Sequence, residues 1–196
     1  EQLYETGLKS QIPISGPYWS PDGRSVLFIG MSGETTGIYK IEIPSGQKTL
    51  LVNIPPHQFC FFALWTLDQK SIIYHQGNPV RIMRHDLEEN RDVELAKAAP
   101  AGLSRIGLSP DGKQLAFTSH ETLSSPWKIC LVSPAGGPIR EIYVTKAGEV
   151  IQWFHWTPDG REIWLRKFTR AADEKSKPAT AFLSISPDGR IIRTLD

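Results

Sequence analysis

A turn phrase, Ser-Pro-Asp-Gly followed by lysine or arginine, recurs along the 196 residues of the chain. Full copies occupy residues 20–24 and 109–113, and a copy that begins with threonine occupies residues 157–161. A fourth copy, at residues 66–70, keeps the aspartate but lacks the proline and the glycine. The four aspartates are 46, 43 and 48 residues apart. A period of this length is typical of propeller repeats, so it constrains the fold more than any other feature.

The phrase has the chemistry of a tight turn. Proline presets φ at the second position of a type I turn, aspartate can hydrogen-bond the nearby backbone, and glycine takes the positive φ that leads into the next strand. This chemistry favours a structural role over metal binding or acid–base catalysis. The residues assigned to turns in this way are Asp22, Gly23, Asp68, Asp111, Gly112, Asp159 and Gly160.

Each repeat contains four runs that have the alternation and β-branched content of strands. A fifth apparent copy of the phrase, around Asp188, lies only 29 residues after Asp159. It fits better as the turn between the third and fourth strands of the last repeat. The sequence therefore predicts an all-β propeller with four four-stranded antiparallel blades. Their approximate bounds are 16–54, 59–97, 103–146 and 150–196, and residues 1–7 are a candidate outer strand of a preceding blade.

The charges almost cancel, with 22 lysines and arginines against 21 aspartates and glutamates. That balance lacks the basic footprint of a nucleic-acid-binding domain, so we expect no nucleic acid to bind this domain. We also expect no membrane span, because no apolar run approaches the roughly 18 residues that one requires. Cys60 and Cys130 lie in apolar stretches of different repeats. They are interpreted as buried free thiols, with a disulfide as the alternative.

Four blades seldom close a ring, although four-bladed propellers exist. An open arc would expose the apolar faces of its first and last blades. The chain begins with Glu1 rather than methionine and carries strand-like runs at both ends. We therefore expect it to be part of a larger propeller, to close as a small ring, or to self-associate through its terminal blades.

Function is expected on the side opposite the Asp-Gly turns, because loops there can vary without disturbing the scaffold. Arg105 and His155 lie in predicted inner strands, where the alternatives are a structural role and contact with a ligand in the channel. The charged segment 167–178 is interpreted either as a solvated loop or as a flap that contacts a partner. The candidate contacts are Arg105, His155, His57, His120, Lys167 and Arg170.

The sequence contains no Gly-x-Ser-x-Gly nucleophile elbow and no glycine-rich phosphate loop. The histidines and cysteines also lack the spacing of a zinc site. We therefore assign no catalytic residue, no metal ligand and no cofactor.

Two segments resemble the WD40-like Pro-Asp repeat of the TolB-type β-propeller family, and the resemblance extends over essentially the whole chain. They read YWSPDGRSVLF at residues 18–28 and LSPDGKQLAF at residues 108–117. The resemblance implies a non-catalytic module that binds a protein partner or a small ligand through the loop face and central channel. Such a module would be a TolB-like or sensor region of a larger bacterial protein, and the resemblance favours a periplasmic or other extracytoplasmic location.

The alternative is an accessory propeller of a prolyl-oligopeptidase-type serine peptidase. It would gate access to a catalytic domain that lies outside this chain. A purely architectural role is the third interpretation.

Overall fold

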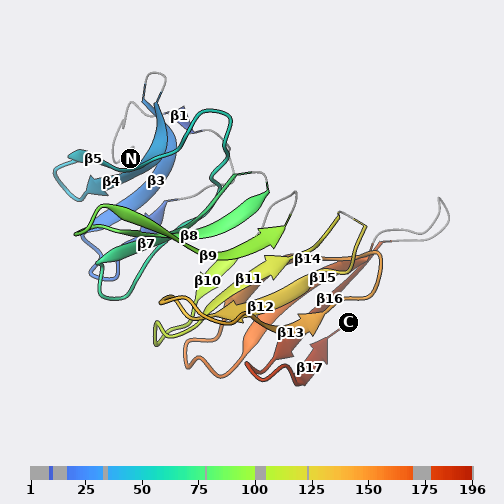
Figure 1. The fold of residues 1–196 in the computed structure, drawn as a ribbon. Helices are drawn as coiled ribbons and strands as arrows, with labels where there is room; N and C mark the ends of the chain where they lie inside the picture. The colour runs from blue at the N-terminus through green and yellow to red at the C-terminus, as the bar shows by residue number, and fades with distance from the viewer. Residues whose placement is uncertain are drawn as a thin grey trace. The chain divides into compact units, whose positions relative to one another are not determined.

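The computed structural model describes residues 9–10, 17–32, 35–77, 79–99, 105–122, 124–169 and 178–195. These ranges consist of strands, turns and irregular connections, with no helix among them. The chain divides into two compact parts, residues 1–94 and 95–196, and the boundary falls inside the ninth strand. Four antiparallel sheets follow one another in chain order (Figure 1). The predicted all-β fold with antiparallel blades is confirmed, and three of the four sheets have the predicted four strands.

The first two sheets contain the following strands: β1 (Lys9–Ser10), β2 (Tyr18–Trp19), β3 (Ser25–Ser32), β4 (Thr35–Glu42) and β5 (Lys48–Asn53), then β6 (Ala63–Trp65), β7 (Ser71–Gln76), β8 (Val80–Asp86) and β9 (Arg91–Ala99). The last two sheets contain β10 (Ile106–Leu108), β11 (Leu115–Ser119), β12 (Lys128–Val132) and β13 (Arg140–Val144), then β14 (Glu149–Trp156), β15 (Ile163–Thr169), β16 (Ala179–Ile185) and β17 (Ile191–Leu195).

The first sheet has one strand more than the repeat predicts. Both β1 and β2 pair with β3, with Lys9 opposite Met31 and Tyr18 opposite Leu27. The inner edge of this sheet is therefore built from two short strands. The outer strand that we expected at residues 1–7 lies outside the described residues.

Each compact part has its own hydrophobic core between two sheets. Successive side chains of a strand point to opposite faces, so every second residue of a central strand can face the neighbouring sheet. In the first part Leu27 and Ile29 of β3 join Ile72 and Tyr74 of β7 in one buried cluster. In the second part β11 and β12 contribute to a cluster with β14, β15 and β16. The sheets of each part therefore pack face to face.

The recurring phrase forms the same hydrogen-bonded turn at every copy. In the third sheet, Ser109 Oγ donates to Asp111 Oδ1 at 2.6 Å, and the Lys113 N–H donates to the same oxygen at 3.1 Å. The Gln114 N–H donates to Ser109 Oγ at 2.9 Å. The turns that begin at Ser20, Thr66 and Thr157 repeat these bonds.

The turn around Asp188 shows that the phrase also works elsewhere in a blade. Ser186 Oγ donates to Asp188, and the Arg190 N–H donates to Ser186 Oγ at 3.1 Å. This turn lies between β16 and β17, the third and fourth strands of the last sheet. The prediction that it is not the start of a fifth repeat is confirmed.

The fourth copy of the phrase, at residues 66–70, forms the same turn although it lacks glycine. Gln69 takes its place with φ of 58°. A left-handed conformation costs a residue with a Cβ about 1–2 kcal/mol, and glycine avoids that cost but loses about 0.5–1 kcal/mol more chain entropy on folding. We therefore expect Gln69→Gly to raise the free energy of unfolding by about 0.5–1 kcal/mol in urea denaturation. Gln114→Gly, at a position without a positive φ, is the matched control and should lower it. A lower free energy of unfolding for Gln69→Gly than for the parent would show that the left-handed backbone at Gln69 is not strained.

Candidate functional site

The turn aspartates are held by the fold. The hydrogen bond from Ser109 and then that from the Lys113 N–H hold the pKa of Asp111 below its ordinary value. A side-chain hydroxyl is the main cause of the lowered pKa at Asp22, Asp68, Asp159 and Asp188 as well. A carboxylate with a lowered pKa is a poor proton donor near neutral pH. The turn network accounts for these groups, and the connections that could carry a site lie at the opposite ends of the strands.

In the first part, that side carries the connection between β5 and β6. Its second half runs alongside the end of β7, because the Gly77 N–H donates to the Phe59 carbonyl at 3.0 Å and the His75 N–H donates to the Phe62 carbonyl at 3.3 Å. Phe59 is 50% exposed and stacks on Phe61, with ring centroids 5.9 Å apart. A large aromatic side chain is thus held on the surface of a sheet edge.

Beneath these rings lies a buried histidine. His75 is 1% exposed, and its ring lies 5.3 Å from that of Phe61 and 5.4 Å from that of Phe62. Neither of its ring nitrogens has a hydrogen-bond partner in the described structure, and the same is true of Gln58 Oε1. Burial lowers the pKa of His75 to about 4. The imidazole is therefore neutral at pH 7.

In the second part, the loop side carries a histidine stacked on a tryptophan. The ring centroids of His120 and Trp127 lie 4.2 Å apart. His120 Nδ1 is 3.1 Å from the Thr122 carbonyl, which can only accept, so this nitrogen carries the proton. Burial lowers the pKa of His120. Neither His120 Nε2 nor Trp127 Nε1 has a partner among the described residues.

A chain of hydrogen bonds leads from this stack to an ion pair. The Trp127 N–H donates to Thr145 Oγ1 at 2.8 Å, and that hydroxyl donates to the Glu149 carbonyl at 3.2 Å. Glu149 Oε1 accepts from Lys167 Nζ at 2.7 Å, and Glu149 Oε2 accepts from the Lys146 N–H at 2.9 Å. Burial alone would raise the pKa of Glu149, but these two bonds and the charges of the lysines lower it. The pair is therefore a fixed, mostly buried part of this side.

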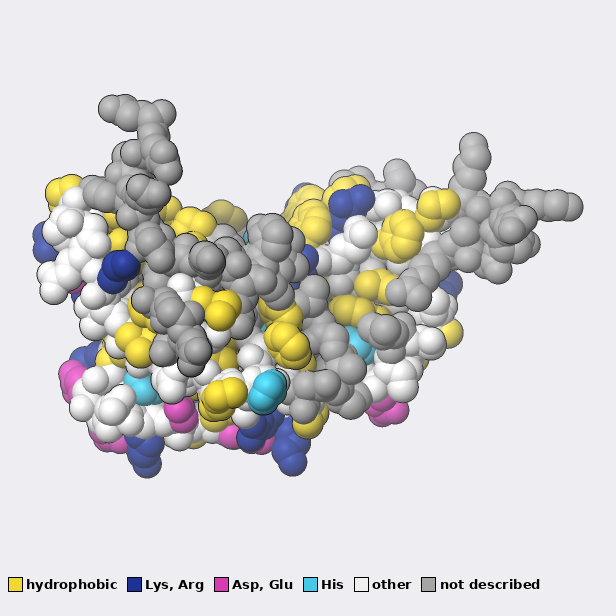
Figure 2. Space-filling model, turned by 90° about the horizontal axis from the view of Figure 1, so that it is seen from above, with side chains coloured by type: hydrophobic (Ala, Val, Ile, Leu, Met, Phe, Trp, Pro, Cys, Tyr) yellow, Lys and Arg dark blue, Asp and Glu magenta, His cyan; other side chains and the backbone are white. Residues whose placement is uncertain are grey.

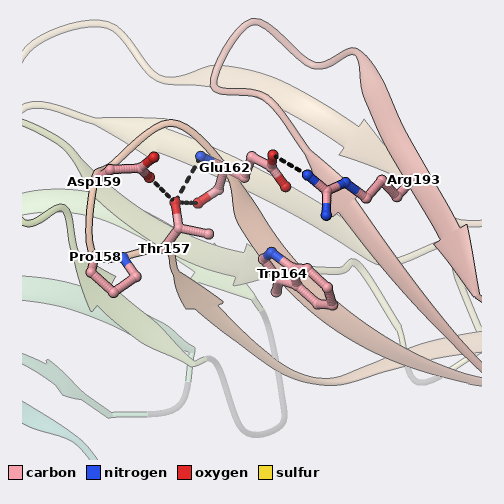
Figure 3. Close-up of a pocket in the computed structure, with 6 residues that line it drawn as sticks. All are labelled: Thr157, Pro158, Asp159, Glu162, Trp164 and Arg193. Atoms are coloured by element: carbon pink, nitrogen blue, oxygen red, sulfur yellow. Dashed lines mark hydrogen bonds and ion pairs between the residues drawn. The ribbon is translucent and has the colours of Figure 1, made fainter.

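A separate hollow of about 410 Å³ lies near the turn of the last sheet. Figure 3 shows the carboxylate of Glu162 beside the guanidinium of Arg193, with the indole of Trp164 below them. Arg193 Nη2 lies 3.6 Å from Glu162 Oε1, whereas Glu162 Oε2 is buried without a hydrogen-bond partner in the described structure. The hollow is lined by Thr157, Pro158, Asp159, Glu162, Trp164 and Arg193.

Of the six candidate contacts, four are described in the second part and one in the first. His120 and Lys167 lie on the loop side of the second part, and both are held by neighbours. His57 is exposed in the connection of the first part, with φ of 65°. His155 is exposed on β14 with its ring 5.5 Å from that of Trp153. The Arg105 N–H donates to Thr118 Oγ1 at 2.9 Å, and Arg170 lies outside the described residues.

Four residues of these surfaces were not singled out from the sequence. They are Phe59, His75, Trp127 and Glu149. One signal for Phe59 was available in the sequence. The connection before the second turn contains the run Phe59-Cys60-Phe61-Phe62, which is too apolar for a solvated connection. The burial of His75 had no such signal in the sequence, because it depends on how the rings of Phe61 and Phe62 pack against the imidazole.

The remaining chemistry of the described residues is simple. Cys60 and Cys130 are free and buried, so the interpretation as buried thiols is confirmed. Burial raises the pKa of Cys130 to about 11. The described residues contain no group of three or more histidine, cysteine or acidic side chains that could hold a metal ion. They also contain no helix that is long and apolar enough to cross a membrane.

No protein-family model matches the chain, but individual proteins do. The "Uncharacterized peptidase YuxL" of Bacillus subtilis is 25% identical over 190 residues, which cover 92% of this chain and 27% of that protein. The "Tol-Pal system protein TolB" of Francisella tularensis is 42% identical over 41 residues, which cover 21% of this chain and 9% of that protein. The chain thus spans less than a third of either relative.

A solved structure extends the likeness to the fold. The crystal structure of TolB from Acinetobacter baumannii matches 94% of this chain and 42% of its own, with a TM-score of 0.67 and 23% identity. The match therefore extends over nearly the whole chain, and the repeated turn motif agrees with a propeller fold. The chain therefore has a TolB-like β-propeller fold.

Proposed function

We propose that this chain is a binding module for a protein partner, and that its contact surface is the loop side centred on Phe59. Interface hot spots are typically large aromatic side chains on a rigid support. Phe59 meets this description, because half of its surface is exposed while its ring stacks on Phe61 and its carbonyl accepts from Gly77. Figure 2 shows several exposed groups of hydrophobic side chains, with histidine side chains beside some of them.

The surroundings of Phe59 support a specific contact rather than a merely apolar one. His57 is exposed two residues before it in the sequence, and the prolines Pro55 and Pro56 limit the freedom of the same connection. A surface that is already ordered loses less entropy when a partner binds. The local similarity to a Tol-Pal system protein supports a protein as the partner.

The test is a comparison of two single substitutions. Phe59→Ala should weaken retention of partner proteins at least about tenfold, which is the effect of losing a hot spot of about 1.4 kcal/mol. Leu50→Ala is the matched control, because Leu50 is similarly exposed, at 43%, but lies on the outer strand β5. The measurement is affinity capture from the source organism followed by quantitative mass spectrometry. Equal retention by both variants would contradict the proposal, provided that both melt like the parent protein.

A second candidate is an accessory propeller of a peptidase. The similarity to the uncharacterized peptidase YuxL favours it, because that similarity covers 92% of this chain. The full-length gene separates the two candidates. An α/β-hydrolase region with a Gly-x-Ser-x-Gly motif would favour the peptidase. In that case Phe59→Ala should change hydrolysis of long peptides by the whole protein more than hydrolysis of a dipeptide substrate.

A further inference from the structure

The two ends of the strands in the first part differ in charge. At one end, the opposite ends from the turns, lie the tip of the β3–β4 hairpin at residues 30–37, the β5–β6 connection at 54–62 and the tip of the β7–β8 hairpin at 76–80. Glu34 is the one charged residue in these three segments. At the other end, the four hairpin turns carry ten charged residues: Asp22, Arg24, Glu42, Lys48, Asp68, Lys70, Asp86, Glu88, Glu89 and Arg91.

Lys9 and Arg81 border the nearly uncharged segments. The backbone of Lys9, on β1, lies opposite Met31. Arg81 directly follows the β7–β8 tip, and its Nη1 lies 4.0 Å from Glu94 Oε2, so that carboxylate offsets its charge. Neither residue belongs to the β5–β6 connection, which lies within an unbroken run, residues 49–67, without aspartate, glutamate, lysine or arginine.

The β5–β6 connection also carries the exposed aromatic residue of this end. Half of the surface of Phe59 is exposed, and its ring lies at an angle of only 5° to that of Phe61. The Gly77 N–H joins the β7–β8 tip to the Phe59 carbonyl. We call this connection and this tip together the Phe59 surface. The core of a protein interface is typically poor in charged residues and rich in aromatic ones. Both features coincide on the Phe59 surface.

Given the protein-binding role proposed for this surface, we infer that its partner docks through an uncharged segment that places an apolar side chain against Phe59. A charged group of a partner would lose hydration at this contact and would meet no opposite charge within the β5–β6 connection. An apolar side chain has no such cost and removes the exposed part of Phe59 from water. Salt screens attraction between charges, so a contact of this kind should depend little on ionic strength.

The first experiment uses a random library of short peptides displayed on phage as the probe. The library is selected on the parent chain and counter-selected on Phe59→Ala. The enriched peptides should be rich in aliphatic and aromatic residues and poorer in aspartate, glutamate, lysine and arginine than the unselected library. Enriched peptides that share a charged residue at a fixed place would overturn the inference. So would the absence of any peptide that requires Phe59.

The second experiment places either charge at one position and measures the affinity of an enriched peptide. His57 is exposed in the β5–β6 connection, so His57→Glu and His57→Lys change the charge of the surface without removing a buried group. Both should weaken binding at least about threefold, because either ion must lose water at the contact. Gln47→Glu and Gln47→Lys are the matched controls in the β4–β5 turn, where Gln47 is exposed, and both should bind like the parent. The affinity of the parent should change less than about twofold between about 0.05 and 0.5 M NaCl.

Tighter binding with one charge and weaker binding with the other would identify a charged partner segment and overturn the inference. A steep loss of affinity with salt would do the same. The proposed function is decided separately, because it fails when Phe59→Ala and Leu50→Ala retain partner proteins equally. Retention of proteins that requires Phe59, together with enrichment of charged peptides, would leave the binding role in place and remove only the uncharged segment.

Discussion

Between pH 6.5 and about 4, the protein is expected to lose about 3 kcal/mol of unfolding free energy through His75 alone. The pKa of this group is lower in the folded state than its ordinary value of 6.5 because the ring is buried. The unfolded chain therefore takes up a proton first as the pH falls. The contribution is fully present above pH 6.5, is lost progressively down to about pH 4, and does not fall further below it.

The structure explains why protonation is unfavourable. The ring lies between Phe61 and Phe62, and neither ring nitrogen has a partner in the described structure that could accept a hydrogen bond from an imidazolium. A buried charge without a partner is strongly destabilising. Replacement by an apolar side chain removes both the charge and the two unsatisfied nitrogens.

The measurement is urea denaturation at several pH values between 7 and 4. His75→Leu should be at least as stable as the parent at pH 7 and should lose about 3 kcal/mol less on going to pH 4. His57→Leu is the control, because His57 is exposed, and it should keep the pH dependence of the parent. The prediction is wrong if His75→Leu retains that dependence.

Gly189→Ala is expected to lower the free energy of unfolding by about 2–5 kcal/mol. Two costs add at this position. A side chain with a Cβ at φ of 92° costs about 1–2 kcal/mol, and the Cβ would lie only 2.6 Å from the Ile142 carbonyl oxygen. Relief of such overpacking requires a backbone shift, which typically costs about 1–3 kcal/mol.

Gly136→Ala is the matched control, because it carries only the backbone cost, so its difference from Gly189→Ala gives the cost of the close contact. Gly136 has φ of 91°, almost the same as Gly189, but a Cβ there would meet nothing within 4 Å. Its substitution should therefore cost only about 1–2 kcal/mol. Thermal and urea unfolding of both variants measure the difference. Equal losses would show that the turn at Gly189 does not press on β13.

The turns could be predicted from the sequence because their chemistry is local. Ser109 and Asp111 are two residues apart, and their hydrogen bond forms wherever the chain bends in this way. The turn at Asp188 has the same local chemistry, and only its spacing of 29 residues from Asp159 separated it from the start of a repeat. Local chemistry could not predict that Gln69 would adopt the left-handed conformation of the glycine that it replaces, because a left-handed glutamine is tolerated only when the rest of the turn holds it there.

The candidate contacts illustrate the opposite case. His57, His120 and His155 have the same side chain, and the sequence treats them alike. In the structure His57 and His155 are exposed, while His120 is buried against Trp127. The exposure of each histidine depends on which other side chains pack against its ring. That packing is set by the tertiary structure, so no local sequence pattern predicts it.

The recurring turn phrase by itself determined the repeat and the order of its four strands. These follow from hydrogen bonds that span five residues or fewer and from the alternation of side chains along a strand. Only the tertiary structure decided which face of each sheet is covered. Trp19, Trp65 and Trp156 hold the same place in the repeat, yet just one of them is largely exposed, because burial depends on the segments that pack against a side chain and not on its place in the repeat.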